Sequence, residues 1–265
     1  MPTKVAIHGA AGRMGQRLVA LGAADEQIEI VAAIENTFSP HADKDAGELA
    51  GVGPIGVVLS PAWPAEVDAM IDFSVPEATD GLIDRCVERG VPLVFATTGL
   101  SDEQEQRLQS AASAIAICKA ASMSTAVNLT MKLAELAAGT LKGHPSGVDV
   151  EVIERHHRYK EDSPSGTALA FGGVIGEAMG LTSETHGRHG RPGERPRGEI
   201  GYHAVRAGDN PGEHTIVFGL LGETIELRVS ATNRDCYATG ALAAAKWLQG
   251  KPPGVYDMQD VLGLR

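Results

Sequence analysis

KVAIHGAAGRMG, at residues 4–15, runs a short apolar segment directly into three glycines. Its first five residues predict a strand, and the residues from Arg13 onward predict a helix. In a turn of this kind Gly9 permits the sharp bend, and Gly12 lets the backbone approach a pyrophosphate. Gly15 lets the helix pack closely on the strand. The spacing G-x-x-G-x-x-G differs from the usual G-x-G-x-x-G, so the surrounding sequence has to support a dinucleotide site.

That support comes from the second predicted strand, Ile28–Ile34, which is followed by Glu35. A carboxylate at this place accepts hydrogen bonds from the adenosine ribose hydroxyls. It also repels a 2′-phosphate, which a neighbouring arginine would attract, and the next residue here is Asn36. We therefore predict NADH and/or NADPH as cofactor, with NADH used at least as well as NADPH. Arg13 could still support NADPH from the glycine turn. The alternative is a turn of small residues beside a surface glutamate.

Short apolar runs alternate with helical patterns through the first 120 residues. Strands separated by helices of about 10–15 residues imply βαβ units and a parallel sheet. The predicted strands are residues 4–8, 28–34, 69–73, 92–95 and 115–119, and the predicted helices are 13–23, 76–89 and 101–114, the last opened by a capping box at Ser101 and Gln104.

The pattern changes after about residue 122. Here we predict helices at 125–138, from Ser165 to 179 and at 236–249, and strands at 148–157, 200–205, 214–219 and 224–231 that alternate like antiparallel strands. Residues 182–199 have no hydrophobic period and predict a long mobile loop, which could close over a substrate, reach a neighbour or be disordered. The predicted fold is α/β, with a Rossmann-type parallel-sheet domain over residues 1–125, to which 236–265 return. A central α+β domain with a mainly antiparallel sheet spans 126–235.

Composition and charge exclude several classes of protein. The formal net charge is −11, which argues against a nucleic-acid partner because phosphate backbones need clustered lysine and arginine. Cys86, Cys118 and Cys236 lie far apart, as expected for reduced thiols in the cytosol. The apolar run at the N-terminus is too short for a signal peptide, and no run approaches the roughly 18 residues of a membrane span. We expect a cytoplasmic protein with no membrane partner.

A second concentration of chemistry lies at residues 154–160, ERHHRYK. Three cations and two histidines in so short a stretch of an acidic protein favour a site for a small polyanion. Ser165 then follows as a candidate N-cap, so that the N–H groups of Gly166 and Thr167 would be open to a carboxylate.

The two adjacent histidines have a simpler interpretation as one buried and one solvated strand residue. Neighbouring residues on a strand point to opposite faces, so at most one of His156 and His157 can face a given pocket directly. A metal site that adds His203 and His214 is conceivable, but no ligand spacing supports it, and we predict no metal.

With these segments in hand, the chain resembles the dihydrodipicolinate reductase (4-hydroxy-tetrahydrodipicolinate reductase) family of lysine and diaminopimelate biosynthesis. The matching stretches extend over essentially the whole chain. They are GAAGRMG at 9–15, DAGELAG at 45–51, IDFSVPE at 71–77, TTG at 97–99, ERHHRYKEDSPSGTA at 154–168, RAGDNPGEHT at 206–215 and YDMQDVLGL at 256–264. The string E-x-H-H-x-x-K-x-D-x-P-S-G-T-A is highly specific to this family.

The resemblance implies a set of cofactor contacts. They are Gly9, Ala10, Ala11, Gly12, Arg13 and Met14 at the pyrophosphate, Glu35 at the ribose, and Ala96, Thr97, Thr98, Ala120, Ala121, Ser122 and Met123 near the nicotinamide. The family usually has Asn and Phe where this chain has Ser122 and Met123, so the resemblance does not extend to the side-chain contacts of these two residues.

The resemblance also implies the reaction. Hydride passes from the nicotinamide to a cyclic unsaturated imine that carries two carboxylates, with loss of water from the hydroxylated precursor. His156 matches the family's proton donor, and Lys160 its second catalytic residue. His157, Gly166 and Thr167 match its substrate-carboxylate contacts. Family members are tetramers in which the central sheets associate, so we expect a homotetramer whose partner is a small dicarboxylate.

Two other classes of function remain open on the residues alone. An aspartate or homoserine dehydrogenase-like enzyme would share the glycine turn but should lack the HHRYK and PSGT strings. A non-catalytic NAD-sensing protein would bind the nucleotide without needing the basic cluster. Lys160 could also form a Schiff base with a substrate, although a substrate that already carries an imine does not require one.

Overall fold

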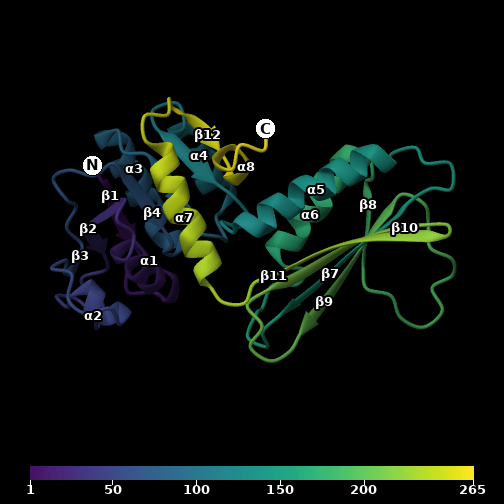
Figure 1. The fold of residues 1–265 in the computed structure, drawn as a ribbon, viewed down its shortest axis with the longest axis horizontal. Helices are drawn as coiled ribbons and strands as arrows, with labels where there is room; N and C mark the ends of the chain where they lie inside the picture. The colour runs from purple at the N-terminus through teal and green to yellow at the C-terminus, as the bar shows by residue number, and fades with distance from the viewer. The chain divides into compact units, whose positions relative to one another are not determined.

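The computed structural model describes residues 1–265 and divides them into two compact units. Unit 1 consists of Met1–Thr125 together with Arg234–Arg265, and unit 2 consists of Ala126–Asn233. Each unit has its own sheet (Figure 1). None of the helices combines the length and apolarity that crossing a membrane requires.

Unit 1 is built on a seven-stranded sheet in which every neighbouring pair is parallel. In spatial order its strands are β12 (Gly254–Tyr256), β6 (Ala116–Lys119), β5 (Leu93–Phe95), β4 (Ala69–Asp72), β1 (Thr3–His8), β2 (Ile28–Ile34) and β3 (Leu59–Ser60). The predicted parallel sheet is confirmed, and it gains two edge strands, β3 and β12, that were not predicted.

Helices cover both faces of this sheet. They are α1 (Arg13–Ala23), α2 (Ala46–Ala50), the 3₁₀ helix η1 (Pro76–Ala78), α3 (Thr79–Arg89), α4 (Asp102–Ala111), α7 (Asp235–Leu248) and α8 (Met258–Val261). Along β1, Val5 and Ile7 belong to a core shared with α1 and α7, whereas Ala6 belongs to one shared with α3 and α4. This alternation is the two-residue period of a strand. The predicted capping box at Ser101 and Gln104 is confirmed at the start of α4.

The returning helix α7 packs tightly in unit 1. Ala238, Ala241 and Ala245 are fully buried along it. Its Gly240 lies so close to the chain before α5 that a Cβ added there would be 1.7 Å from the carbonyl oxygen of Met123. Small residues thus permit the close approach between the last helix and the first part of the chain.

Unit 2 contains a five-stranded sheet with two helices. Its elements are α5 (Thr125–Leu141), β7 (Asp149–His156), α6 (Gly166–Met179), β8 (Ser183–His186), β9 (Glu199–Arg206), β10 (Glu213–Leu220) and β11 (Glu223–Ser230), with strand order β11-β10-β7-β9-β8. The helices α5 and α6 bury their apolar residues against one face of the sheet. The pairs β7–β10 and β10–β11 are antiparallel as expected, but β7–β9 and β8–β9 are parallel, so the sheet is mixed.

The stretch 182–199 corrects one prediction. It was expected to be a long loop without regular structure, but Ser183–His186 forms β8, which pairs in parallel with β9. This strand reads SETH and is mostly exposed, so it carries no hydrophobic period that the sequence could reveal.

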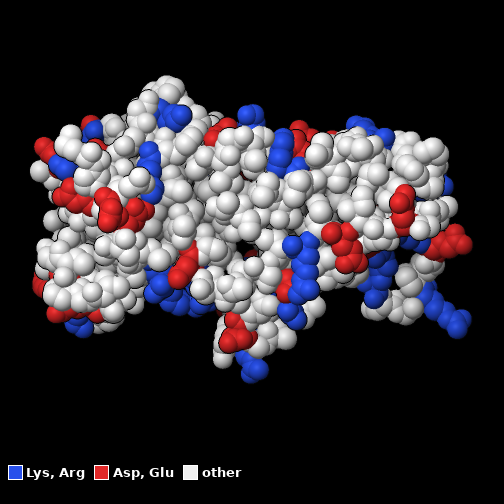
Figure 2. All heavy atoms as spheres, in the orientation of Figure 1, with Lys and Arg blue, Asp and Glu red and all other residues white.

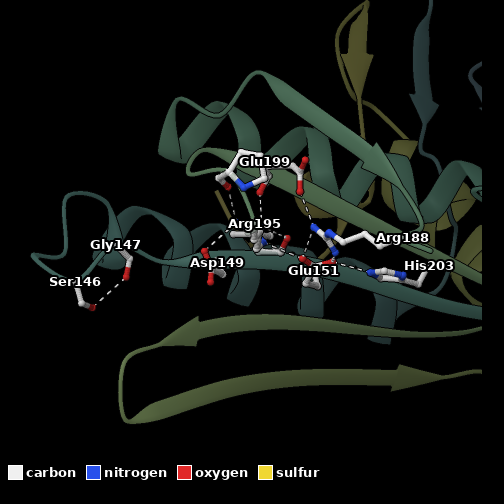
Figure 3. Close-up of polar contacts among 10 residues, drawn as sticks. Ser146, Gly147, Asp149, Glu151, Arg188, Arg195, Glu199 and His203 are labelled. Atoms are coloured by element: carbon white, nitrogen blue, oxygen red, sulfur yellow. Dashed lines mark hydrogen bonds and ion pairs between the residues drawn. The ribbon is translucent and has the colours of Figure 1, made fainter. Parts of the chain in front are cut away.

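Two arginines tie the rest of this stretch to the sheet (Figure 3). Arg188 contacts Glu151 on β7 at 2.9 Å and Glu199 on β9 at 2.5 Å. Arg195 donates to Glu151 at 3.0 Å and to Asp149 at 2.8 Å. The segment between β8 and β9 is therefore fixed along the outward side of β7.

Candidate functional site

The glycine turn of unit 1 has the shape expected of a phosphate cradle. Gly9 has a φ of 78°, and a Cβ there would be 2.7 Å from the carbonyl oxygen of Phe73. A Cβ on Gly15 would be 2.2 Å from the oxygen of Gly9, so the helix can approach the turn only without one. Helix α1 begins after Gly12 with no side-chain cap, which leaves the N–H groups of its first turn open to an anion.

A cavity of about 710 Å³ adjoins this turn. Gly9, Ala11 and Gly12 line it, together with Glu35 and Asn36 at the end of β2. The volume lies in the range of small-molecule sites. Three of the residues predicted for the pyrophosphate therefore meet the residue predicted for the ribose at one cavity, and this arrangement fits a dinucleotide.

The carboxylate of Glu35 is held by the backbone around it. One oxygen accepts from the N–H of Ala11 at 3.0 Å, and the other accepts from the N–H of Asn36 at 2.9 Å. Each carboxylate oxygen can accept a further hydrogen bond. Glu35 is thus oriented by the glycine turn and can still accept from ribose hydroxyls.

Trp63 and Arg85 are among the cavity residues that were not predicted from the sequence. Trp63 follows β3, and Arg85 lies on α3 with its guanidinium carbon 5.7 Å from the centre of the Trp63 ring. Arg89 is at 5.6 Å from the same ring, but it does not line the cavity and it donates to the carbonyl of Ala65. No sequence motif signals Arg85, because it reaches the cavity through helical periodicity from Gly81, which also lines it.

The other predicted pyrophosphate residues lie beside the turn. Ala10 is buried in the core, and Arg13 and Met14 are the first two residues of α1. None of the three lines the cavity, so the cation that does line it is Arg85 rather than Arg13.

The segment Ala96, Thr97 and Thr98 follows β5 at the carboxyl edge of the parallel sheet. The hydroxyl of Thr97 donates to the buried carboxylate of Asp72 at 2.7 Å and accepts from the N–H of Ser74 at 3.1 Å. Asp72 also contacts Nδ1 of His8 at 2.7 Å. These bonds tie the ends of β1, β4 and β5 together and orient the segment, which does not line the cavity described above.

The segment from Ala120 through Ala121 to Met123 follows β6 at the same edge. Ser122 is 8% exposed and Met123 is 2% exposed, and the Met123 side chain belongs to the core of unit 1. A buried core side chain is not available to a ligand, so Met123 contributes packing at this position.

In unit 2 the predicted catalytic histidine ends strand β7. His156 is 7% exposed, and its Nδ1 lies 2.6 Å from a carboxylate oxygen of Glu154. Arg206 on β9 contacts both oxygens of the same carboxylate, each at 2.7 Å. Burial alone would raise the pKa of Glu154, but the hydrogen bonds from His156 and Arg206 outweigh it and lower the pKa to about 2. Glu154 and Arg206 lie in stretches that match the family, but the sequence predicts no role for them.

A second imidazole lies beside the first. The ring of His214 on β10 meets that of His156 edge to face at 5.2 Å, and its Nε2 is 3.1 Å from the hydroxyl of Ser165. Burial is the main cause that lowers the pKa of His214 to about 4, so this imidazole is neutral at pH 7.

The predicted N-cap at the start of α6 is present. Ser165 is the N-cap, as predicted, and its hydroxyl accepts from the N–H of Ala168 at 3.1 Å. Gly166 and Thr167 open the helix, so their N–H groups belong to the first turn, which has no intrahelical acceptor for them.

The remaining predicted residues lie in the loop after β7. Lys160 forms an ion pair of 2.7 Å with Asp162. Burial would raise the pKa of Asp162, but the hydrogen bond from Lys160, the charges of Lys160 and Arg206 and a backbone hydrogen bond together lower it. His157 donates its backbone N–H to the carbonyl of Asn210 at 2.8 Å. An anionic substrate at Lys160 would therefore compete with the carboxylate of Asp162 for the ammonium group, or share that ammonium with it.

No group of three or more histidine, cysteine, aspartate or glutamate side chains is arranged to hold a metal ion. His203, which the metal hypothesis included, contacts Glu151 at 2.7 Å on the outward side of the sheet. Over the face seen in Figure 2, acidic and basic side chains are interspersed.

Comparisons with known proteins agree over both units. The sequence profile described as "Dihydrodipicolinate reductase, N-terminus" matches residues 3–123, and that described as "Dihydrodipicolinate reductase, C-terminus" matches residues 126–262. A 4-hydroxy-tetrahydrodipicolinate reductase of Rhodopirellula baltica is 58% identical over 271 residues, covering 99% of this chain and 97% of the relative. One of Alkalilimnicola ehrlichii is 48% identical over 271 residues, covering 100% of both.

A solved structure described as dipicolinate-bound dihydrodipicolinate reductase from Paenisporosarcina sp. TG-14 matches with a TM-score of 0.74 and 25% identity, covering 98% of this chain and 99% of that one. This match confirms the predicted α/β fold with its second, sheet-containing domain. An amine dehydrogenase from Mycobacterium smegmatis, with a TM-score of 0.62 and 16% identity over 96% of this chain and 94% of its own, shares the fold alone.

Proposed function

Because the chain belongs to the dihydrodipicolinate reductase family over both of its units, we propose that it reduces (hydroxy-)dihydrodipicolinate to tetrahydrodipicolinate in lysine and diaminopimelate biosynthesis. The observation that carries the proposal is the fold of residues 154–168. This one stretch supplies a buried imidazole at His156, a cation at Lys160 and the open first turn of α6. A cyclic imine with two carboxylates needs both a proton donor and anion contacts.

A nicotinamide cofactor supplies the hydride for such a reduction when it is bound. In this chain the turn from Gly9 to Met14 would hold its pyrophosphate, and Glu35 would accept from its ribose hydroxyls. The segments Ala96–Thr98 and Ala120–Met123 would contact its nicotinamide end, the latter through the backbone because the Met123 side chain is in the core.

The substrate contacts are proposed residue by residue. The ammonium of Lys160 and the N–H groups of Gly166 and Thr167 would bind a carboxylate, and His157 would contact the other charged end of the ring. Positive groups around the ring withdraw electron density from it and stabilise the negative charge that develops during reduction. His156 would then deliver a proton to the reduced ring.

We propose that NADH is used at least as well as NADPH. Glu35 is fixed by Ala11 and Asn36 at the end of β2, where its charge would repel a 2′-phosphate. Arg85 is the only arginine that lines the same cavity and would favour NADPH. Comparing kcat/KM for the two nucleotides tests whether the effect of Glu35 or that of Arg85 prevails. A hundredfold preference for NADPH would contradict the proposal.

The finer statements on assembly and location are likewise proposals. We propose a cytoplasmic homotetramer in which the outward faces of the five-stranded sheets associate. Ile153 on β7 and Val205 on β9 leave 40% and 43% of their surface exposed on that face. Light scattering on the purified protein should give four times the mass of one chain, and the mass of a monomer would contradict it.

The reaction itself is tested by a coupled assay. Aspartate semialdehyde and pyruvate are supplied with the upstream synthase, and the oxidation of NADH and of NADPH is followed separately by absorbance. We expect oxidation that requires all of the components. Nucleotide binding without such turnover would instead favour a dinucleotide-sensing protein.

A further inference from the structure

We propose that Glu154, held by Arg206, is a positioning residue that fixes the proton of His156 on Nδ1 and leaves Nε2 as the atom that transfers a proton. The inference rests on the proposed function only in assigning that transfer to the reduction of the substrate. The position of the hydrogen on the His156 ring follows from the structure of unit 2 by itself.

Four donors converge on the carboxylate of Glu154. One oxygen lies 3.1 Å from the backbone N of Ser165 and 2.7 Å from Nη2 of Arg206. The other lies 2.7 Å from Nη1 of Arg206 and 2.6 Å from Nδ1 of His156. The carboxylate is 1% exposed, so these protein contacts replace its hydration.

The ionised state of Glu154 determines the tautomer of His156. The pKa of Glu154 is about 2, so the group is ionised at neutral pH and can only accept hydrogen bonds. Nδ1 of His156 must therefore be the donor in their 2.6 Å contact. In the neutral imidazole Nε2 then carries no hydrogen, and in the cation it carries the hydrogen that can be given away.

Arg206 keeps the carboxylate in this orientation. Its guanidinium bridges the two oxygens as a fork, the geometry that makes arginine–carboxylate pairs specific. Nη2 also donates to the carbonyl of Asp162 at 2.6 Å, so the same side chain ties the loop that carries Lys160 to β9. Replacing the guanidinium should loosen both the carboxylate and this loop.

The other charged groups near His156 do not provide an alternative acceptor. On β10 the facing group is His214, which is neutral at pH 7 because burial lowers its pKa to about 4. In the following loop Lys160 is a cation paired with Asp162. Arg206 approaches from β9 and is a donor only. Glu154 is thus the carboxylate that contacts this imidazole.

The proposed proton step is balanced. The Nε2–H bond of the imidazolium breaks, a C–H bond forms on the reduced substrate ring, and the electron pair stays on Nε2. The other proton stays on Nδ1 throughout and remains hydrogen-bonded to Glu154. A proton from solvent restores the imidazolium for the next turnover.

The test compares Glu154→Gln with Glu177→Gln, a matched change at an exposed position of α6 in the same unit. A glutamine amide carries one acceptor oxygen and one NH₂ donor, so it cannot accept from all four donors. We expect kcat to fall by about 10²–10⁴-fold with little change in KM, as when a general acid is misplaced. Glu177→Gln should behave like the unmodified protein.

A second readout does not depend on turnover. In protein labelled with ¹⁵N-histidine, long-range NMR correlations distinguish a protonated ring nitrogen from an unprotonated one, with His156 assigned by its own substitution. We expect neutral His156 of the unmodified protein to be protonated on Nδ1, and Glu154→Gln to increase the Nε2-protonated form. Failure of the reductase assay would leave this measurement intact, so the two proposals can fail separately.

The outcomes that overturn the inference are definite. A neutral His156 protonated on Nε2 in the unmodified protein would overturn it, even if Glu154→Gln does not fold. So would a folded Glu154→Gln variant with unchanged kcat. Glu154→Asp keeps the charge but shortens the side chain, so it should be more active than Glu154→Gln. A role confined to packing predicts no such difference.

Discussion

At the scale of single residues, the imidazole of His156 is where the proposed chemistry concentrates. It is buried at the end of β7 between a carboxylate and a second imidazole. We predict that His156→Ala lowers kcat by about 10²–10⁴-fold and raises KM far less, because a general acid acts in the transition state. Steady-state kinetics measures this, with the exposed His189→Ala as control. Near-normal turnover would remove His156 from the mechanism.

The residues around the nucleotide cavity lead to a second prediction. Arg85 lines the cavity, and Arg89 contacts the same Trp63 ring without lining it. We expect Arg85→Ala to weaken NADPH binding by about tenfold, and NADH binding less, because a guanidinium forms charge-assisted hydrogen bonds with a phosphate. Arg89→Ala should change neither.

Binding of ADP-ribose and of its 2′-phosphate, measured by calorimetry, checks this prediction without turnover. If Arg85→Ala weakened the binding of both ligands equally, Arg85 would contact the adenine ring and would not discriminate between ligands with and without the 2′-phosphate. No weakening of either would show that the side chain lies outside the binding site.

Residues of the site divide into those that a sequence can reveal and those that it cannot. Glu35 could be predicted because a strand, a glycine turn and an acidic residue follow one another at fixed distances. His156 and Ser165 lie in one contiguous string. Arg206 contacts Glu154 from another strand, and Arg85 reaches the cavity from a helix. Such contacts depend on how distant segments pair, which no local pattern determines.

At the scale of elements, the central strands and the longer helices of unit 1 were predictable to within three residues, whereas the edge strands and the short helices α2 and α8 were not. β3 has two residues and β12 has three, too few to establish a period. β8 is short and mostly exposed. Edge strands are defined by the backbone partner beside them, and that partner is known only once the sheet has formed.

The segment between β8 and β9 gives the third prediction. Burial would raise the pKa of Glu151, but hydrogen bonds from Arg188, Arg195 and His203 lower it to about 2. The folded pKa lies below the ordinary 4.5, so this stabilisation is complete above about pH 4.5 and is lost as the pH falls toward 2. It amounts to about 3 kcal/mol at most.

Glu151→Gln measures that contribution. We expect the variant to be less stable than the unmodified protein at pH 7, and the difference to shrink as the pH falls from 4.5 to 2. Urea unfolding at several pH values tests this, with Glu226→Gln, exposed on β11, as the matched control. Hydrogen exchange in residues 187–198 should also increase. A difference that does not change with pH would contradict the assignment to this carboxylate.

At the scale of the whole molecule, unit 1 is formed by two separated parts of the chain. Ser124 and Cys236 share a side-chain hydrogen bond, so the ends at which unit 2 is inserted lie next to each other. We predict that a protein in which a short Gly-Ser linker replaces residues 126–233 folds and binds NADH. It should not reduce the substrate, because His156 and Lys160 are gone. Circular dichroism and NADH fluorescence check this.

The reverse deletion is the control. Removing residues 234–265 takes away α7, whose Ala241, Ala244 and Leu248 are fully buried in the core of unit 1. This variant should lose nucleotide binding. Nucleotide binding by the variant that lacks residues 234–265 would contradict the prediction. So would failure of the variant with the Gly-Ser linker to fold, because unit 1 would then not be self-contained.

The return of α7 to the first unit also sets an order of events during synthesis. A ribosome translates from the N-terminus, so all of unit 2 emerges before the helix that completes the nucleotide fold. A nascent chain stalled anywhere before residue 235 therefore lacks α7, and with it part of the core that supports the glycine turn. Prematurely terminated chains should be unable to sequester the cell's reduced nucleotide, because only a finished polypeptide can assemble the place that holds it.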